Sequence, residues 1–225
     1  GVAHEINNPL TVILLANEMI SRELNKQKIE PGSALERIES QANDIQRASR
    51  SIQKLADHLR NFSRGMVENF ELVDLNNVIE DSLFISKNKI QKARVSLKNN
   101  FEPGKYLVNG CPNHLEQVFI NVIGNACDAM HDAEQRAMDI SVSPDRRDSG
   151  RFWRIDISDT GVGIPENLLP EVFQSFFTTK EKGKGTGLGL SISRGIIKDH
   201  KGEIEVASEH GKGTTFSILL PQAEI

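Results

Sequence analysis

Residues 173–191 read FQSFFTTKEKGKGTGLGLS and combine four glycines with three lysines before an apolar helical pattern begins. The segment is not a Walker A loop, because no Gly-Lys pair is followed by Ser or Thr at the required spacing, and GxGxxG does not occur in it. Gly187-Leu188-Gly189 leads directly into a helix predicted over 188–200, and backbone N–H groups at a helix N-terminus bind phosphate. A flexible linker is the alternative, but the apolar helix that follows at once argues against a mere tether. The stretch therefore predicts a phosphate-facing loop.

A second stretch lies upstream, where residues 156–165 read DISDTGVGIP. Alternating apolar residues end at Asp159, and a carboxylate at a strand end can accept a hydrogen bond from an exocyclic amine. Gly161 and Gly163 would let the backbone approach a flat ring closely. A plain strand followed by a turn remains the alternative, since Asp and Gly favour turns.

A third stretch, residues 121–130, reads NVIGNACDAM. Asn121 and Asn125 are four residues apart and share one face of a predicted helix, while the apolar residues between them cover the core side. Taken alone, this pattern is also what a solvated helix face gives.

The same half of the chain mixes strand and helix patterns, which predicts an α/β sandwich with one face of its sheet covered by helices. Strands are predicted at 71–74, 94–101, 138–143, 152–158, 203–207 and 214–220, helices near 76–90, 113–130 and 188–200, and a polar hairpin loop at 143–151.

The first part of the chain has heptad spacing instead. Apolar positions recur at Ile6, Leu10, Ile13, Ile20 and Leu24, with Asn17 in the same seam, and then at Ile38, Ile45, Ile52 and Leu59. Pro31 and Gly32 separate the two runs, which predicts an antiparallel helical hairpin. Because a single hairpin leaves its seam poorly covered, two copies are expected to form a four-helix bundle and hence a homodimer. The predicted domains are 1–66 and 71–225, joined by a short linker.

The composition of the chain argues against several kinds of partner and site. A net charge of −4 without a basic block argues against nucleic acid as a partner. No run of 18 apolar residues occurs, so no membrane contact is expected within this chain. Cys111 and Cys127 belong to no ligand pattern, and buried free thiols in a reducing compartment are expected. Without an initiator methionine and with only three residues before His4, the chain is expected to be a cytoplasmic fragment, with any membrane anchor in a region N-terminal to it.

The opening residues GVAHEINNPL suggest a zinc site at first, because HExxH on a helix binds zinc. Asn8 stands where the second histidine would be, and asparagine is a poor zinc ligand, so this reading fails. His4 lies two residues before Ile6, about 200° around the helix, and is therefore expected to point away from the seam. Pro9 should bend the helix here. In the alternative, Asn8 is an N-cap and Pro9 begins the helix, which would leave His4 outside it.

Together, and in this order, residues 121–130, 156–165, 173–191 and 211–221 resemble the N, G1, F and G2 boxes of the Bergerat-fold (GHKL) ATP-binding domain. HEINNPL resembles the H-box of sensor histidine kinases from two-component systems, most closely the nitrogen-regulation type. The resemblance covers nearly the whole chain. It implies ATP and Mg²⁺ as cofactors, autophosphorylation of a histidine, and transfer to an aspartate in the receiver domain of a response regulator.

The resemblance also implies roles for single residues. Asn125 matches the Mg²⁺ ligand, Asn121 its support, and Asp159 the residue that reads the adenine amine. Residues 174–186 match a mobile lid. Further nucleotide-binding positions are Gly161, Gly163, Thr179, Lys180, Gly185, Thr186, Gly187, Leu188 and Gly189. Ser175 departs from the proline that many relatives have there, and Asp128 stands where other branches carry a basic residue.

At the H-box, His4 matches the phosphoacceptor. Glu5 can hydrogen-bond one ring nitrogen and take up the proton as the imidazole attacks. Asn8 lies one helical turn beyond His4 on the same exposed side, where an amide could orient water against a regulator's phosphoaspartate. The expected function is a protein-histidine kinase with phosphatase activity on its regulator. The alternatives are a chaperone-like or topoisomerase-like ATPase and a catalytically silent dimerisation module.

Overall fold

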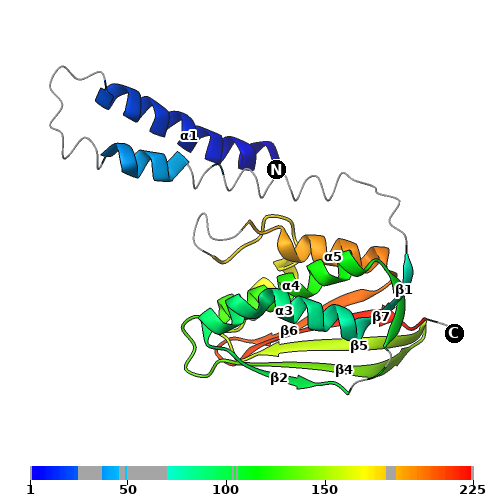
Figure 1. Cartoon of the computed structure of the whole chain (residues 1–225). Helices are drawn as coiled ribbons and strands as arrows, with labels where there is room; N and C mark the ends of the chain where they lie inside the picture. The colour runs from blue at the N-terminus through cyan, green and yellow to red at the C-terminus, as the bar shows by residue number, and fades with distance from the viewer. Residues whose placement is uncertain are drawn as a thin grey trace. The chain divides into compact units, whose positions relative to one another are not determined.

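The computed structural model describes residues 2–24, 37–45, 49, 70–102, 104, 106–180 and 186–223. The chain divides into two compact units, of which the larger comprises 67–179 and 187–225. The smaller unit comprises 1–66 and 180–186 and contains the first helix and a second helical stretch at 37–45. Each unit is described by itself (Figure 1).

Helix α1 spans Val2–Leu24 and begins before His4. His4, Glu5 and Asn8 therefore lie within the helix, and the alternative that made Asn8 an N-cap is wrong. Nothing in the sequence before Pro9 stops the helix, although proline cannot supply its N–H to the helical ladder.

One face of α1 is better buried than the rest. Ala16 is buried, and Ile13 and Ile20 are half-buried at the three- and four-residue spacings of a single helix face. Leu10 and Leu24 of the predicted seam are exposed in the single chain, as are Val12, Leu14, Leu15 and Met19. In the stretch 37–45, Ile38 and Ile45 are half-buried seven residues apart, as the heptad pattern predicts. Ile52 and Leu59 lie outside the described residues.

The larger unit is built on a five-stranded sheet in the order β2-β4-β5-β7-β6. Its strands are β2 (Ser96–Asn100), β4 (Ala137–Arg147), β5 (Gly150–Asp159), β7 (Gly213–Pro221) and β6 (Glu203–Glu209). Strands β2 and β4 pair in parallel, and the other neighbours are antiparallel. The last strand in the sequence, β7, thus lies inside the sheet and separates β5 from β6.

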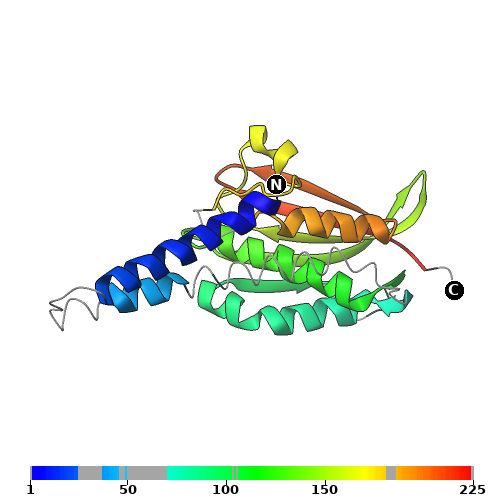
Figure 2. The same cartoon turned by 90° about the horizontal axis from the view of Figure 1, so that it is seen from above.

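Three helices lie on one face of this sheet: α3 (Leu75–Ala93), α4 (Pro112–Ala129) and α5 (Gly189–Asp199) (Figures 1 and 2). A separate two-stranded sheet pairs β1 (Glu71–Asp74) with β3 (Leu107–Gly110). A short 3₁₀ helix, η1, spans Glu166–Glu171. The predicted α/β sandwich with helices on one face is therefore confirmed, whereas β3 was not predicted.

Local sequence signals set the helix ends. Asp74 caps α3 by accepting a hydrogen bond from the backbone N–H of Asn76 at 3.1 Å. Arg94 ends the same helix in the left-handed conformation, and its N–H donates to the carbonyls of the last turn. Pro112 occupies the first turn of α4, where its missing N–H would have no helical partner in any case.

The core lies between the helices and the sheet. Ile157 pairs across the sheet with Ile140 and Phe216, and all three are buried. From α4, Leu115, Phe119 and Ile123 are fully buried against this surface, and so is Met130, which follows the helix as its C-cap. Burying a side chain of this size contributes about 1.5–3 kcal/mol, so the apolar face of α4 fixes the helix firmly on the sheet.

The predicted loop at 143–151 is mostly strand, because β4 continues to Arg147 and β5 begins at Gly150. Arg147 contacts Glu203 at 2.7 Å and Glu205 at 2.9 Å, both on β6. The composition of this polar strand segment resembles that of a loop, and for that reason the sequence pattern wrongly predicted a loop at 143–151.

Cys111 and Cys127 are free and buried, as predicted. Among the described residues, no helix has the length and apolar character needed to cross a membrane.

Candidate nucleotide site

Asp159 is the last residue of β5 and is buried, with 7% of its surface exposed. The backbone N–H of Gly161 donates to its Oδ1 at 2.8 Å. Burial raises the pKa of the Asp159 carboxyl, although backbone hydrogen bonds from Gly161 and Thr214 oppose this effect. The strand thus ends in a buried acceptor that a donor on a ligand could reach.

The turn after β5 requires glycine for steric reasons. A β-carbon on Gly161 would lie 2.7 Å from Asp159 Oδ1 and 2.8 Å from Ala129. The neighbouring Val162 N–H donates to the carbonyl of Ala129 at 3.1 Å, which ties the turn to the end of α4. Gly163 has a φ of 67°, and a side chain there would meet the backbone of Glu209. The turn is therefore wedged between the ends of α4 and β6.

Helices α4 and α5 meet through Asn121. Its Nδ2 donates to Ser193 Oγ at 3.0 Å. Gly189, at the start of α5, lies so close to the Asn121 amide that a β-carbon would overlap it. Asn121 and Gly189, predicted from two separate motifs, are therefore in direct contact.

The two ends of the predicted lid are joined by a backbone hydrogen bond. The N–H of Phe176 donates to the carbonyl of Gly187 at 2.9 Å. Both residues have positive φ, 72° for Phe176 and 65° for Gly187. Between them, Thr179 is exposed, while Lys180 and Thr186 are half-buried, as is Leu188 next to Gly187. Residues 181–185, including the predicted Gly185, lie outside the described residues.

Asn125 lies one turn after Asn121 on the same face of α4 and is half-buried. The structure thus brings together Asn121, Gly189 and the Asp159 turn around the C-terminal half of α4. His4, Glu5 and Asn8 belong to α1, and their side chains lie outside the described part of the chain.

Sequence reasoning missed three residues of this region. Ser193 holds Asn121, Thr214 helps hold Asp159, and Lys89 of α3 contacts Asp128 at 2.8 Å. Ser193 could have been predicted from the sequence, because it is a polar residue four positions after Gly189 on the inner face of an apolar helix. Lys89 gave no such signal, since lysines are common on exposed helix faces.

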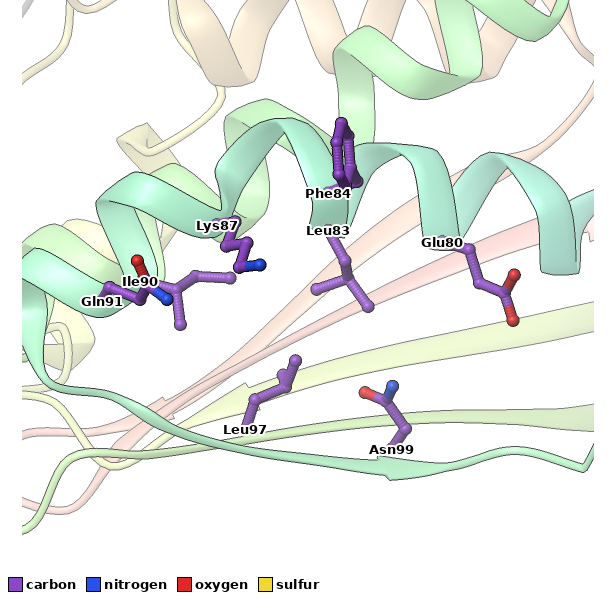
Figure 3. A pocket seen from close by; sticks show the side chains of 8 residues that line it. All are labelled: Glu80, Leu83, Phe84, Lys87, Ile90, Gln91, Leu97 and Asn99. Carbon is purple, nitrogen blue, oxygen red and sulfur yellow. The ribbon is translucent and has the colours of Figure 1, made fainter.

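Two hollows adjoin the sheet. One, of about 330 Å³, lies between α3 and β2, with Leu83, Ile90 and Leu97 inside and Glu80 and Asn99 at its rim (Figure 3). None of the predicted nucleotide residues lines it. The other, of about 240 Å³, lies at the ends of β2, β4 and β5 and includes Asp159. The predicted site is therefore defined by the contacts of α4, α5 and the turn after β5 rather than by either hollow.

Two family models match the chain. The model described as "Histidine kinase-, DNA gyrase B-, and HSP90-like ATPase" matches residues 110–224. The model described as "His Kinase A (phospho-acceptor) domain" matches residues 1–66.

Curated relatives align over the whole chain. The sensor kinase CckA of Brucella abortus is 35% identical, and the alignment covers 99% of this chain and 24% of CckA. The sensor protein FixL of Bradyrhizobium diazoefficiens is 34% identical, with 100% of this chain and 43% of FixL covered. The chain therefore spans less than half the length of these two relatives.

Solved structures of histidine kinases also align with this chain. The catalytic domain of histidine kinase ThkA aligns with a TM-score of 0.56 at 28% identity, over 68% of this chain and 97% of that domain. A structure of ThkA in complex with the response regulator protein TrrA aligns with a TM-score of 0.68 at 27% identity, over 99% of this chain and 60% of ThkA.

Proposed function

Because this chain belongs to the sensor histidine kinases of two-component systems, we propose that it binds Mg²⁺-ATP and transfers the γ-phosphoryl group to its own His4. The observation that carries the proposal is that one segment, 121–130, contacts both other motifs: Asn121 meets Gly189 and Ser193, and Ala129 holds the turn that follows Asp159. Three motifs that are far apart in the sequence meet there, in the part of the chain matched by an ATPase family.

The adenine is assigned to Asp159. Its ionised carboxylate accepts a hydrogen bond from the exocyclic amine, and the N–H groups of Gly161 and Thr214 hold the carboxylate in place. Because Gly161 has no side chain, the ring can lie close to the turn.

The metal is assigned to Asn125. Among the described residues, no group of three or more His, Cys, Asp or Glu side chains could hold a metal ion. An amide oxygen fits Mg²⁺ all the same, because Mg²⁺ usually takes one or two protein ligands and completes its shell with phosphate oxygens and water. The ion, when bound, would neutralise negative charge on the phosphates.

Transfer is assigned to the H-box of α1. One imidazole nitrogen of His4 attacks the γ-phosphorus, so a nitrogen–phosphorus bond forms while the bond to the β,γ-bridging oxygen breaks and ADP leaves. Glu5 takes up the proton of the other ring nitrogen. Helical geometry supports this assignment, since adjacent residues lie about 100° apart around the helix.

We further propose the domain division 1–66 and 71–225, a homodimer formed through the heptad seam, and transfer from His4 to an aspartate of a response regulator. The complex of ThkA with TrrA supports a regulator as partner. The exposed Leu10 and Leu24 of α1 support the dimer, because both belong to the predicted seam. Phosphatase activity through Asn8 remains part of the proposal.

A chaperone-like or topoisomerase-like ATPase is the competing function, because the ATPase family includes both HSP90 and DNA gyrase B. The phosphoacceptor domain matched at 1–66 favours the kinase. A silent dimerisation module is disfavoured by the presence of Asn125, Asp159 and the glycines at 187 and 189.

The test is incubation with Mg²⁺ and γ-labelled ATP. The label should become bound to the protein, should be lost in acid as a phosphoramidate is, and should be missing from His4→Gln although that variant still binds ATP. Hydrolysis of ATP without any protein-bound label would support the competing ATPase. Acid-labile label on His4→Gln would place the acceptor elsewhere.

A further inference from the structure

The outer face of α4 carries a contact that the proposed function does not use. Lys89 of α3 places its Nζ 2.8 Å from Oδ1 of Asp128 on α4. Both side chains are partly exposed, 46% for Lys89 and 37% for Asp128. A solvent-exposed ion pair stabilises a fold by only about 0–1 kcal/mol, so stability alone is a weak reason for this arrangement.

The position of the ammonium is set by Gly124. A β-carbon on Gly124 would lie 3.2 Å from Lys89 Nζ, so the ammonium lies directly over the backbone of α4. Residues three and four apart share a helix face, which places Asn121, Gly124, Asn125 and Asp128 on one patch. Lys89 therefore reaches from another helix into the patch that contains the proposed Mg²⁺ ligand.

The C-terminal half of α4 has negative charge but no positive charge of its own. Helix α4 contains no Lys or Arg, and its C-terminal half is flanked by the carboxylates of Asp128 and Asp159. Lys89 therefore supplies a positive charge next to Asp128, on the helix face that also carries Asn125.

We propose that Lys89 is a further nucleotide-binding residue, whose ammonium donates to the phosphate oxygens of ATP at the Asn125 end of α4. Asp128 holds the lysine by one of the three N–H donors of its ammonium, and the phosphates receive the others. The inference rests on the proposed function, because the ligand is the triphosphate of the same nucleotide. It adds α3 to the elements that form the site.

The test compares Lys89→Met with Lys87→Met in otherwise unchanged protein. Both variants remove one positive charge from α3, but Lys87 lines the hollow between α3 and β2 and lies away from α4 (Figure 3). Calorimetric titration with Mg²⁺-ATP and with adenosine separates the phosphate contact from the adenine contact. Thermal unfolding of each variant shows whether the fold is kept.

Lys89→Met should weaken Mg²⁺-ATP binding about tenfold, leave adenosine binding unchanged and unfold at nearly the wild-type temperature, since one charge-assisted hydrogen bond is lost. Lys87→Met should bind both ligands as wild type does. Wild-type ATP affinity in Lys89→Met, or an equal loss for adenosine, would overturn the inference and leave the proposed function intact. Wild-type protein that binds no ATP would overturn the proposed function itself.

Discussion

Asp159 combines two requirements that oppose each other. Its carboxylate is buried at the end of β5, and burial disfavours the ionised form. The proposed contact with adenine needs that ionised form as an acceptor. The N–H groups of Gly161 and Thr214 reduce the conflict without removing it, because the pKa remains above its ordinary value.

This conflict predicts a pH dependence for Asp159→Asn. In the folded wild type the pKa is above that of the unfolded chain, so the contribution of Asp159 to stability is present at low pH and is lost as pH rises through the folded pKa. The free energy of unfolding of the variant relative to wild type should therefore increase as pH rises from about 4 towards 7. Urea unfolding at several pH values measures it.

The same variant should bind Mg²⁺-ATP about tenfold or more weakly, because it loses a charge-assisted hydrogen bond. A stability difference that stays flat or decreases with rising pH would contradict the role of burial. Unchanged ATP affinity would remove Asp159 from the site.

At the scale of elements, the contact of α4 with α5 depends on a missing side chain. Gly189 abuts the amide of Asn121, and Asn121 is in turn held by Ser193. Gly195, six residues later in the same helix, has nothing within 4 Å of the position that a β-carbon would occupy. The two glycines therefore differ in packing while sharing one helix.

Gly189→Ala should push α5 away from Asn121, which we expect to cost about 1–3 kcal/mol of stability and at least tenfold in ATP affinity. Gly195→Ala is the matched control and should stabilise the protein by up to about 1 kcal/mol without changing affinity, since alanine favours helix over glycine. Chemical denaturation and calorimetry measure the two effects. If the two variants have the same stability and the same ATP affinity, the close approach of Gly189 to Asn121 matters for neither.

The elements themselves were predictable to different degrees. Long apolar patterns such as those of α3, α4 and α5 specify helices, and their one-sided apolar faces specify a single covered sheet face. Strand β3 was missed because its sequence, LVNG, ends in Asn-Gly, a pair that is typical of a turn. The extension of β4 and β5 was missed because Arg147 finds its partners on β6, and a contact across the sheet leaves no local signature.

At the scale of the whole molecule, the H-box belongs to one unit, whereas Asn121, Asp159 and Gly189 belong to the other, and each set was recognisable from local motifs. The contacts that join those motifs could not be recognised from the sequence. That Gly189 touches Asn121, and that Lys89 crosses from α3 to α4, depends on the packing of helices distant in sequence. Sequence patterns therefore identified the parts of the candidate site, while its assembly came from the fold.

The proposed function of the whole protein includes two opposite activities toward a regulator, and neighbouring residues of α1 should separate them. Glu5→Ala should lose most autophosphorylation, because the base is gone. Asn8→Ala should keep most of it and lose dephosphorylation of the regulator, and alanine should preserve the helix. The lifetime of the phosphorylated regulator with each variant and nucleotide is the measurement. Equal lifetimes with wild type and Asn8→Ala would make Asn8 an ordinary surface residue.

The interior position of β7 has a consequence for synthesis on the ribosome. Residues 213–221 are translated after every other strand, yet they must insert between β5 and β6 and supply the Thr214 N–H that holds Asp159. Until they emerge, β5 has an unpaired edge, and such edges invite aggregation of nascent chains. The proposed ATP site is therefore incomplete until β7 has been synthesised, and a nascent chain that stops before β7 is expected not to bind nucleotide.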